Sequence, residues 1–335
     1  MRRASGCLFG MALGDALAAP VEFLRVPEIL ERYPPDGPRA LEGDPARVTD
    51  DTQMALAVGE ALLAAPRPLT PAGLEGPLRR AFVEWADSPE NNRAPGVTCL
   101  RACDGLRAGL PWPQATVASS KGCGANMRVQ PVALLSFARD GVGPDERAAI
   151  AQFQAALTHG HPTGLAAADL TAAAIRDLLD GGDPKGLPSR LRAYAHNQRG
   201  VYHARWLGPL WQQPSVDSPE TFITRGWDEC LAGLDRLEAA LARGDREADP
   251  CLATGEGWVA EEALMTGLLC FLLFPKDGVA ALRRAAVTAG DSDSIACLAG
   301  SFAGAHLGLD AWPADWLARI EYRDRLQRLG EVWDG

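Results

Sequence analysis

The sequence predicts an all-α fold, because apolar residues recur at helical spacing along most of its 335 residues. Segment 52–64 places apolar side chains at i, i+4, i+7 and i+8, and segments 222–242 and 294–306 each show one apolar helical face. The apolar and polar alternation of half-buried strands is scarce, and Val, Ile and Thr do not cluster between turn signals. Helices joined by short connections are therefore expected.

Proline and glycine clusters separate the predicted helices. They stand at Pro34-Pro35, Pro66-Arg67-Pro68, Pro111-Trp112-Pro113, 181–184 and Pro313. None of them opens a low-complexity linker, and the chain shows no clear internal repeat. We therefore expect a single domain over residues 1–335, although this length is large for one core. The polar stretch 244–258 is expected to be a surface loop.

The composition is that of a globular protein, with 47% apolar and 23% charged residues. A net charge of -10 gives no sign of a basic face, so a nucleic acid partner is not expected. The longest apolar run, Met265–Phe274, is too short to cross a bilayer and predicts a buried core helix. The eight cysteines form no CxxC pair and no signal peptide is evident, which favours the cytoplasm.

An acidic cluster, Thr49-Asp50-Asp51, stands directly before the predicted helix 52–64. Threonine and aspartate are common N-caps, so a capped helix start is the simpler interpretation. Capping, however, requires one acceptor, and this cluster offers two carboxylates and a hydroxyl. The excess of oxygen atoms leaves open a second interpretation, a cation site.

A second acidic cluster, Asp291-Ser292-Asp293-Ser294, precedes the apolar helix 294–306. Capping is again the simpler interpretation. The alternation of Asp291 and Asp293 would allow both carboxylates to converge on one point. Hard cations prefer carboxylate and hydroxyl oxygens, and two clusters facing each other would hold two ions. Together the clusters predict a two-metal hydrolase.

The first predicted helix carries glycines at positions 6, 10 and 14, all on one face. Glycine inside a helix costs about 1 kcal/mol relative to alanine, and close approach of another helix is the usual compensation. Just past this helix, Glu22 lies between apolar residues. It is either a half-exposed loop carboxylate or a general base whose pKa is tuned by its surroundings.

Several segments together resemble the ADP-ribosylglycohydrolase family, which includes the dinitrogenase-reductase-activating glycohydrolase and the vertebrate ADP-ribosylhydrolases. They appear in the family's order and span the chain: GCLFGMALGDALAAPVEF (6–23), VTDDTQMALAVGEALL (48–63), NRAPGVTCL (92–100), KGCGANMRVQPVALL (121–135), THGHPTGLAAADLTAAAI (158–175) and AGDSDSIACLAGSFAGAHLG (289–308). The resemblance implies a compact orthogonal multi-helix bundle with a dinuclear metal site in a central cleft.

The resemblance also implies roles for both acidic clusters. Six residues match the family's two metal-ligand trios: Thr49, Asp50, Asp51, Asp291, Asp293 and Ser294. They imply two divalent ions, with Mg²⁺ expected and Mn²⁺ as the alternative, because both prefer the same hard ligands. Glu22 matches a glutamate that handles the attacking water or the leaving group in some members, and Asp51 is the competitor for that catalytic role.

A glycine-rich loop matches the family element G-N-G-x-x-M-R and is implied to bind substrate through Gly122, Cys123, Gly124 and Met127. Cys123 stands where the family usually has asparagine, whose amide a thiol cannot replace. A tight turn is the alternative for the loop, and a nucleophilic thiol is the alternative for Cys123.

Two further elements match parts of the family's substrate pocket. Gly96, in Ala94-Pro95-Gly96, matches a loop beside the distal ribose, and His159 matches a residue of the pocket. The His-x-His pattern at 159–161 lacks a nearby third ligand for zinc.

The implied activity is hydrolysis of the glycosidic bond between ADP-ribose and an acceptor. An ADP-ribosylated arginine side chain of a protein is the expected substrate, with serine linkages or small ADP-ribosyl compounds as other family substrates and ADP-ribose as the product. The alternatives are an ADP-ribose-binding or immunity protein without turnover, and a structural relative resembling a lens crystallin. A monomer that contacts no membrane is expected.

Overall fold

The computed structural model describes the backbone of residues 1–335 and every side chain except that of Phe137. Its described residues form α-helices and short 3-10 turns, and their β-type pairings are isolated bridges such as Gly122 with Val259. The predicted all-α fold is confirmed. The helices are α1 (Arg3–Ala18), α2 (Val26–Arg32), α3 (Asp50–Ala64), α4 (Pro71–Asp87), α5 (Val97–Arg107), α6 (Trp112–Ala115), α7 (Gln130–Leu134), α8 (Phe137–Asp140), α9 (Pro144–Ala156), α10 (Pro162–Leu179), α11 (Leu187–Gln198), α12 (Ala204–Leu207), α13 (Pro219–Arg243), α14 (Cys251–Thr254), α15 (Ala260–Leu273), α16 (Gly278–Ala285), α17 (Ser292–Leu307), α18 (Ala314–Arg319) and α19 (Arg323–Asp334).

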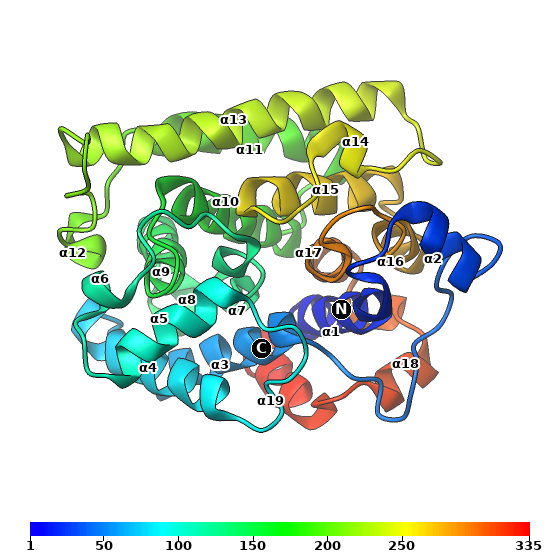
Figure 1. Cartoon of the computed structure of the whole chain (residues 1–335), viewed down its shortest axis with the longest axis horizontal. Helices are drawn as coiled ribbons and strands as arrows, with labels where there is room; N and C mark the ends of the chain where they lie inside the picture. The colour runs from blue at the N-terminus through cyan, green and yellow to red at the C-terminus, as the bar shows by residue number, and fades with distance from the viewer.

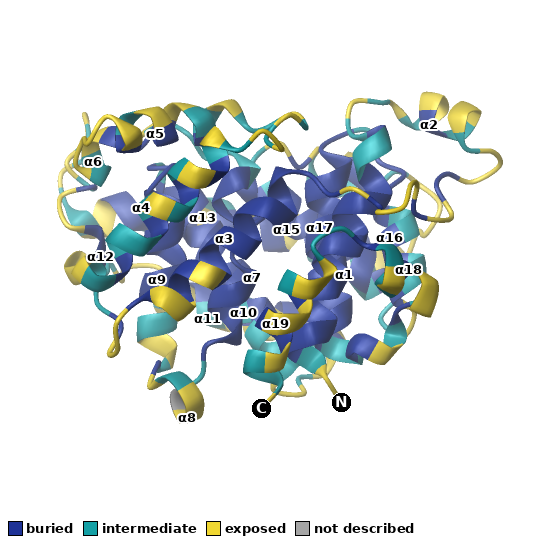
Figure 2. Ribbon diagram, turned by 90° about the horizontal axis from the view of Figure 1, so that it is seen from below, coloured by how far each residue is buried: buried dark blue, intermediate teal, exposed yellow. Residues whose placement is uncertain are grey.

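Helices α1 and α17 form the centre of the fold, and nearly all their residues are buried. Figure 2 shows this central pair in dark blue beneath more exposed outer helices. Each glycine of α1 faces a small residue of α17, in the pairs Gly6 with Gly304, Gly10 with Gly300, and Gly14 with Ala296. A Cβ added at these glycines would overlap the backbone of α17, so the close approach predicted from their spacing is confirmed.

The remaining helices pack around this pair in a compact arrangement (Figure 1). Helix α15, which contains most of the apolar run Met265–Phe274, packs on α17 and is buried along most of its length, as predicted. The long helix α13 covers one side of the molecule. It begins where Ser218 Oγ accepts a hydrogen bond from Thr221 N, and it ends at Gly244 in the left-handed conformation.

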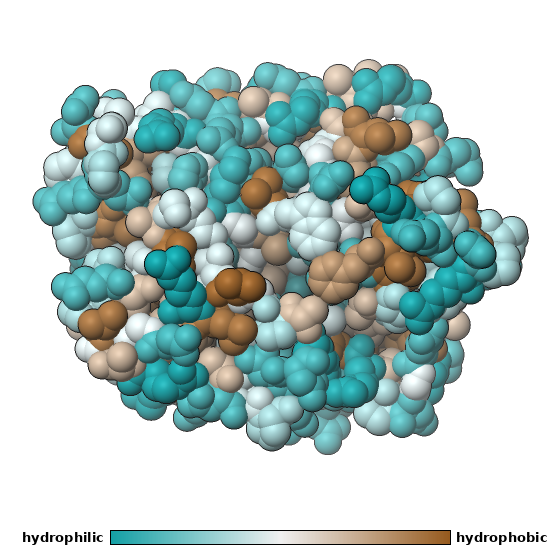
Figure 3. Space-filling view, in the orientation of Figure 1, coloured by the Kyte–Doolittle hydropathy of each residue, from teal (hydrophilic) through white to brown (hydrophobic). Residues whose placement is uncertain are grey.

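Residues Arg3–Val21 are long and apolar enough to cross a membrane, but 89% of this window is buried inside the fold. Packing against α17 accounts for that apolar composition. Figure 3 shows a face composed mainly of hydrophilic residues with small, scattered apolar patches. Most of the expected surface loop 244–258 is irregular and exposed, but its residues 251–254 form the short helix α14, in which Cys251 and Thr254 are buried.

Candidate metal centre and substrate cavity

The first turns of α3 and α17 bring the two acidic clusters together, although they are more than 240 residues apart in the chain. Thr49 Oγ1 lies 3.3 Å from Asp293 Oδ2. Asp50, Asp51, Asp291 and Asp293 are all at least 93% buried. The clusters therefore face each other, as expected from the sequence.

Helix α3 is capped by Asp15 of α1 rather than by its own Thr49. The Asp15 carboxylate accepts hydrogen bonds from the backbone N–H of Thr49 at 2.9 Å and from that of Thr52 at 3.1 Å. The hydroxyls of the two threonines donate to it at 2.9 and 2.5 Å. Thr49 occupies the N-cap position but its side chain accepts no capping bond. Asp50 and Asp51 thus remain available to the site.

The second acidic cluster does not cap its own helix either. Its N-cap residue, Asp291, makes no side-chain capping bond to α17. The backbone N–H of Asp291 donates to the Glu256 carbonyl at 2.7 Å, which fixes the start of the helix. Asp293 Oδ1 accepts from Ser294 N at 2.9 Å. The simple capping interpretation of both clusters is therefore not supported, although both lie at helix starts.

The expected site residues surround one cavity of about 380 Å³. Thr49 is not part of this lining; it lies next to Asp293 and lines a neighbouring cavity. The cavity is lined by Glu22, Asp50, Asp51, Gly96, Gly122, Cys123, Gly124, Met127, His159, Asp291, Asp293 and Ser294, together with other residues such as Phe23 and Trp258.

Glu22 approaches the second cluster more closely than the sequence suggested. One carboxylate oxygen each of Glu22, Asp291 and Asp293 lies within 4.8 Å of the others. These oxygens suit a hard divalent cation, and the buried Asp51 Oδ1 points to the same use because it has no hydrogen-bond partner among the described residues. The residues present therefore fit divalent cations, and Glu22 is itself a candidate ligand.

The pKa values of the clustered carboxyl groups also indicate a cation site. Burial and the neighbouring carboxylates raise the pKa of Glu22 to about 10. Burial raises the pKa of Asp50 to about 7, and it raises that of Asp51 well above its usual range with help from Asp293. So many buried carboxylates cannot all ionise without positive charge nearby. Bound cations would supply that charge.

Arg128 supplies one positive charge near the first acidic cluster. Arg128 is fully buried and donates hydrogen bonds to Gln154 and to Thr158 Oγ1, the latter at 2.7 Å. Its guanidinium also lies 4.5 Å from the centre of the Phe82 ring. The Arg128 charge counteracts the rise in the pKa of Asp50.

The glycine loop and His159 form another part of the cavity wall. A Cβ at Gly124 would lie 2.8 Å from His159 Cε1, so only glycine allows the ring to pack this closely on the loop. Burial and Arg128 lower the pKa of His159, which keeps the ring neutral. Thr158 Oγ1 accepts a hydrogen bond from Arg128 and forms another with His159 Nδ1 at 2.8 Å, which holds the ring in place.

Cys123 lies beside the second acidic cluster, with its Sγ 2.8 Å from Asp291 Oδ2. Burial and Asp291 raise the pKa of the thiol well above its usual range, which disfavours a thiolate nucleophile. The second histidine of the His-x-His pattern serves another purpose, because His161 Nδ1 accepts from Thr163 N at 3.2 Å and caps α10. The two histidines therefore do not form a zinc pair.

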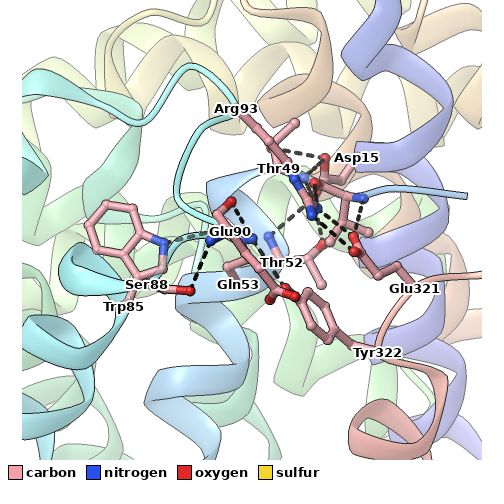
Figure 4. A network of polar contacts seen from close by, with 11 residues as sticks. Asp15, Thr49, Thr52, Gln53, Trp85, Ser88, Glu90, Arg93, Glu321 and Tyr322 are labelled. Atoms are coloured by element: carbon pink, nitrogen blue, oxygen red, sulfur yellow. Dashed lines mark hydrogen bonds and ion pairs between the residues drawn. The ribbon is translucent and has the colours of Figure 1, made fainter. Parts of the chain in front are cut away.

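A polar network holds the loop that leads into α3 (Figure 4). Arg93 Nη1 donates to the Val48 carbonyl and to Glu321 Oε2, both at 2.5 Å, and Glu321 Oε2 also accepts from Val48 N at 3.0 Å. Next to it, Gln53 Nε2 donates to the Tyr322 hydroxyl at 3.3 Å. The C-terminal segment thus fixes the position of the first acidic cluster.

Sequence reasoning did not assign functions to Asp15, Arg128, Phe23 or Trp258. Phe23 and Trp258 stack with ring centres 6.0 Å apart beside the cavity, and both are partly exposed. Asp15 follows Gly14 on the face toward α3, and Arg128 ends the glycine-loop motif. A charged residue inside an apolar helix was the signal available for Asp15.

Known proteins resemble this chain along nearly its whole length. A 26% identical relative is the ADP-ribosyl-[dinitrogen reductase] glycohydrolase of Rhodospirillum rubrum, with 96% of this chain and 91% of the relative covered. The ADP-ribosylarginine hydrolase Tri1 of Pseudomonas putida is 24% identical, with 98% and 77% covered. Human ADP-ribosylhydrolase ARH3 is 26% identical, with 96% and 90% covered.

Solved structures include the same fold. A chain described as an ADP-ribosylglycohydrolase-related protein complex superimposes with a TM-score of 0.69 at 24% identity, covering 99% of this chain and 96% of its own length. The model of the ADP-ribosylglycohydrolase family matches residues 1–334. With the fold and the acidic cavity described above, this match shows that the chain belongs to the ADP-ribosylglycohydrolase family.

Proposed function

We propose that this protein is a metal-dependent hydrolase that cleaves the bond between ADP-ribose and an arginine side chain of a protein. The observation that carries the proposal is the convergence of Glu22 with the two acidic helix starts in one cavity. The family and its named relatives support an ADP-ribosyl glycohydrolase activity. The arginine linkage is proposed because one relative is named an ADP-ribosylarginine hydrolase.

Thr49, Asp50, Asp51, Asp291, Asp293 and Ser294 would hold two divalent cations, with Glu22 as a further candidate ligand. Mg²⁺ is the proposed cation, and when bound it would orient the ribose hydroxyls and activate a water molecule. The cavity beside these residues would hold the ADP-ribose part of the substrate. Its glycine loop offers backbone close to the ligand, and the neutral His159 ring would offer a hydrogen bond to a phosphate or ribose group.

Glu22 is the proposed group that moves the proton. It is only half-buried, it lies just past the end of α1, and it lines the cavity beside Asp291 and Asp293. Asp51 is the competitor, but it is nearly completely buried at the start of α3. A carboxylate at the margin of the cavity can reach both water and the leaving nitrogen, and this accessibility favours Glu22.

The test is to incubate the protein with arginine-linked, serine-linked and nucleic-acid-linked ADP-ribose and to measure free ADP-ribose. We expect release from the arginine-linked substrate in Mg²⁺ and none in EDTA. Substituting both Asp291 and Asp293 with alanine should abolish release together with stabilisation by Mg²⁺. Binding of ADP-ribose without hydrolysis of any substrate would instead support the binding-only alternative.

A further inference from the structure

A second cavity of about 540 Å³ adjoins the first. The two cavities share three lining residues, Glu22, Phe23 and Ala94. On the second side, the lining comes from the end of α1 and from the segment that leads into α3, including Arg47, Val48 and Thr49. Glu22 therefore lies at the boundary between two cavities, with the four aspartates of the acidic clusters and the glycine loop on one side only.

This placement has a consequence for the direction of the substrate. A group that moves a proton during glycoside hydrolysis must lie beside the bond that breaks, so that bond lies at the junction of the two cavities. The side with His159 and the glycine loop suits the ribose and the diphosphate. The acceptor that leaves must then lie on the other side of Glu22, in the second cavity.

The charges of the second cavity indicate what kind of acceptor fits. Two carboxyl side chains, Glu22 and Glu42, line the second cavity together with Arg47 and Arg93. Arg93 is paired with Glu321, and Glu42 Oε1 accepts a hydrogen bond from the neutral Tyr33 hydroxyl at 2.5 Å. Arg47 is exposed and makes no ion pair with any described residue. In a protein with a net charge of -10, this guanidinium is a local cation suited to a carboxylate.

We infer that the second cavity is the acceptor subsite and takes a polypeptide segment with an acidic residue beside the ADP-ribosylated side chain. Arg47 is the residue that determines this specificity, by pairing with the acidic residue. The inference rests on the proposed function, because it assumes that the bond at Glu22 is hydrolysed. A polypeptide fits better than a nucleic acid, because the overall negative charge opposes a polyphosphate backbone.

The experiment compares two peptides that carry the same ADP-ribosylarginine, one with a neighbouring glutamate and one with glutamine in its place. The measured quantity is the ratio of kcat/KM for the two peptides. Because the ratio is taken within each variant, a partial loss of folded protein cancels. We expect the wild type to favour the acidic peptide by about 5-fold, the effect of one partly solvated charge pair, mainly through KM.

Arg47→Glu should reverse this preference, and Arg47→Lys should retain it. The matched control is Arg328→Glu, which makes the same charge change at an exposed arginine of α19 and should keep the wild-type ratio. A ratio unchanged by Arg47→Glu would overturn the inference, as would a wild-type preference for nucleic-acid-linked ADP-ribose. Loss of hydrolysis even with ADP-ribosylagmatine, which has no peptide, would instead refute the proposed function.

Discussion

The close packing of α1 on α17 predicts a large effect of one added methyl group, in the variant Gly10→Ala. The new Cβ would come closest to the Gly300 carbonyl oxygen, and it would lie 2.8 Å from the Gly300 carbonyl carbon and 2.5 Å from Trp312 Cζ2. Ordinary contact begins at 3.4 Å, so the helices must separate by at least 0.6 Å (3.4 minus 2.8) at this carbon. Gly300 and Trp312 both belong to rigid, buried parts of the fold. The overlap at the Gly300 carbonyl involves backbone, so rotation of a side chain cannot relieve it.

Two opposing contributions determine how far Gly10→Ala lowers the free energy of unfolding. Overpacking of a core costs ~1–3 kcal/mol, and contact with backbone favours the upper end. Alanine returns ~0.5–1 kcal/mol through its better helix propensity. We expect the free energy of unfolding to fall by about 2 kcal/mol. Turnover should also fall, because α1 leads to Glu22 while α17 carries Asp293.

Urea unfolding followed by circular dichroism measures this free energy. The matched control is Gly200→Ala, an exposed position where the added Cβ would meet only Glu220 atoms at 3.5 Å or more. That variant should unfold within ~1 kcal/mol of the wild type. A Gly10→Ala protein as stable as the Gly200→Ala protein would refute the claim that backbone contact between α1 and α17 requires glycine.

Three further predictions concern carboxyl groups of the fold and the site. Asp15→Ala should lower the free energy of unfolding by about 3 kcal/mol, because two backbone N–H groups at the start of α3 lose their acceptor. Burial raises the pKa of Asp169 from 3.8 to about 6, so the folded state binds more protons between these values and stability falls as pH rises through them. Asp169→Asn should remove this loss, which is about 2 kcal/mol between pH 4 and pH 7 and is measured by urea unfolding at both pH values. Glu22→Gln should lose most turnover yet keep a rise in Tm with Mg²⁺, because the glutamine oxygen remains a ligand.

Each of these predictions has its own control. For Asp15, the variant Asp15→Asn keeps one acceptor oxygen and should lie between alanine and wild type, and equal stability of all three would contradict the capping role. For Asp169, the decisive quantity is the change in the free energy of unfolding with pH. If this change were the same in Asp169→Asn and the wild type, it would contradict the raised pKa of Asp169. For Glu22, unchanged turnover of the glutamine variant would transfer the proton role to Asp51.

The sequence predicted the helices and the acidic clusters because both leave local patterns. Apolar spacing marked α3, α13 and α17, and three glycines at intervals of four marked the contact face of α1. The pairing of the clusters was inferred from their shared chemistry, and the structure places them opposite each other.

Tertiary contacts account for what the sequence did not show. The cap of α3 comes from Asp15, 34 residues before Thr49, and no local motif encodes a cap that another helix supplies. The ion pair of Arg93 with Glu321 spans 228 residues. The boundary position of Glu22 depends on two cavities that exist only after α1, α3 and the intervening segment pack together.

The most direct test of the central claim is the release of free ADP-ribose from an ADP-ribosylarginine protein as a function of Mg²⁺ concentration. We predict release that rises to saturation with Mg²⁺, stops in EDTA and is absent in Asp293→Ala at every concentration. Release that continues in EDTA, or that survives in Asp293→Ala, would contradict a hydrolase built on cations held by the two acidic helix starts.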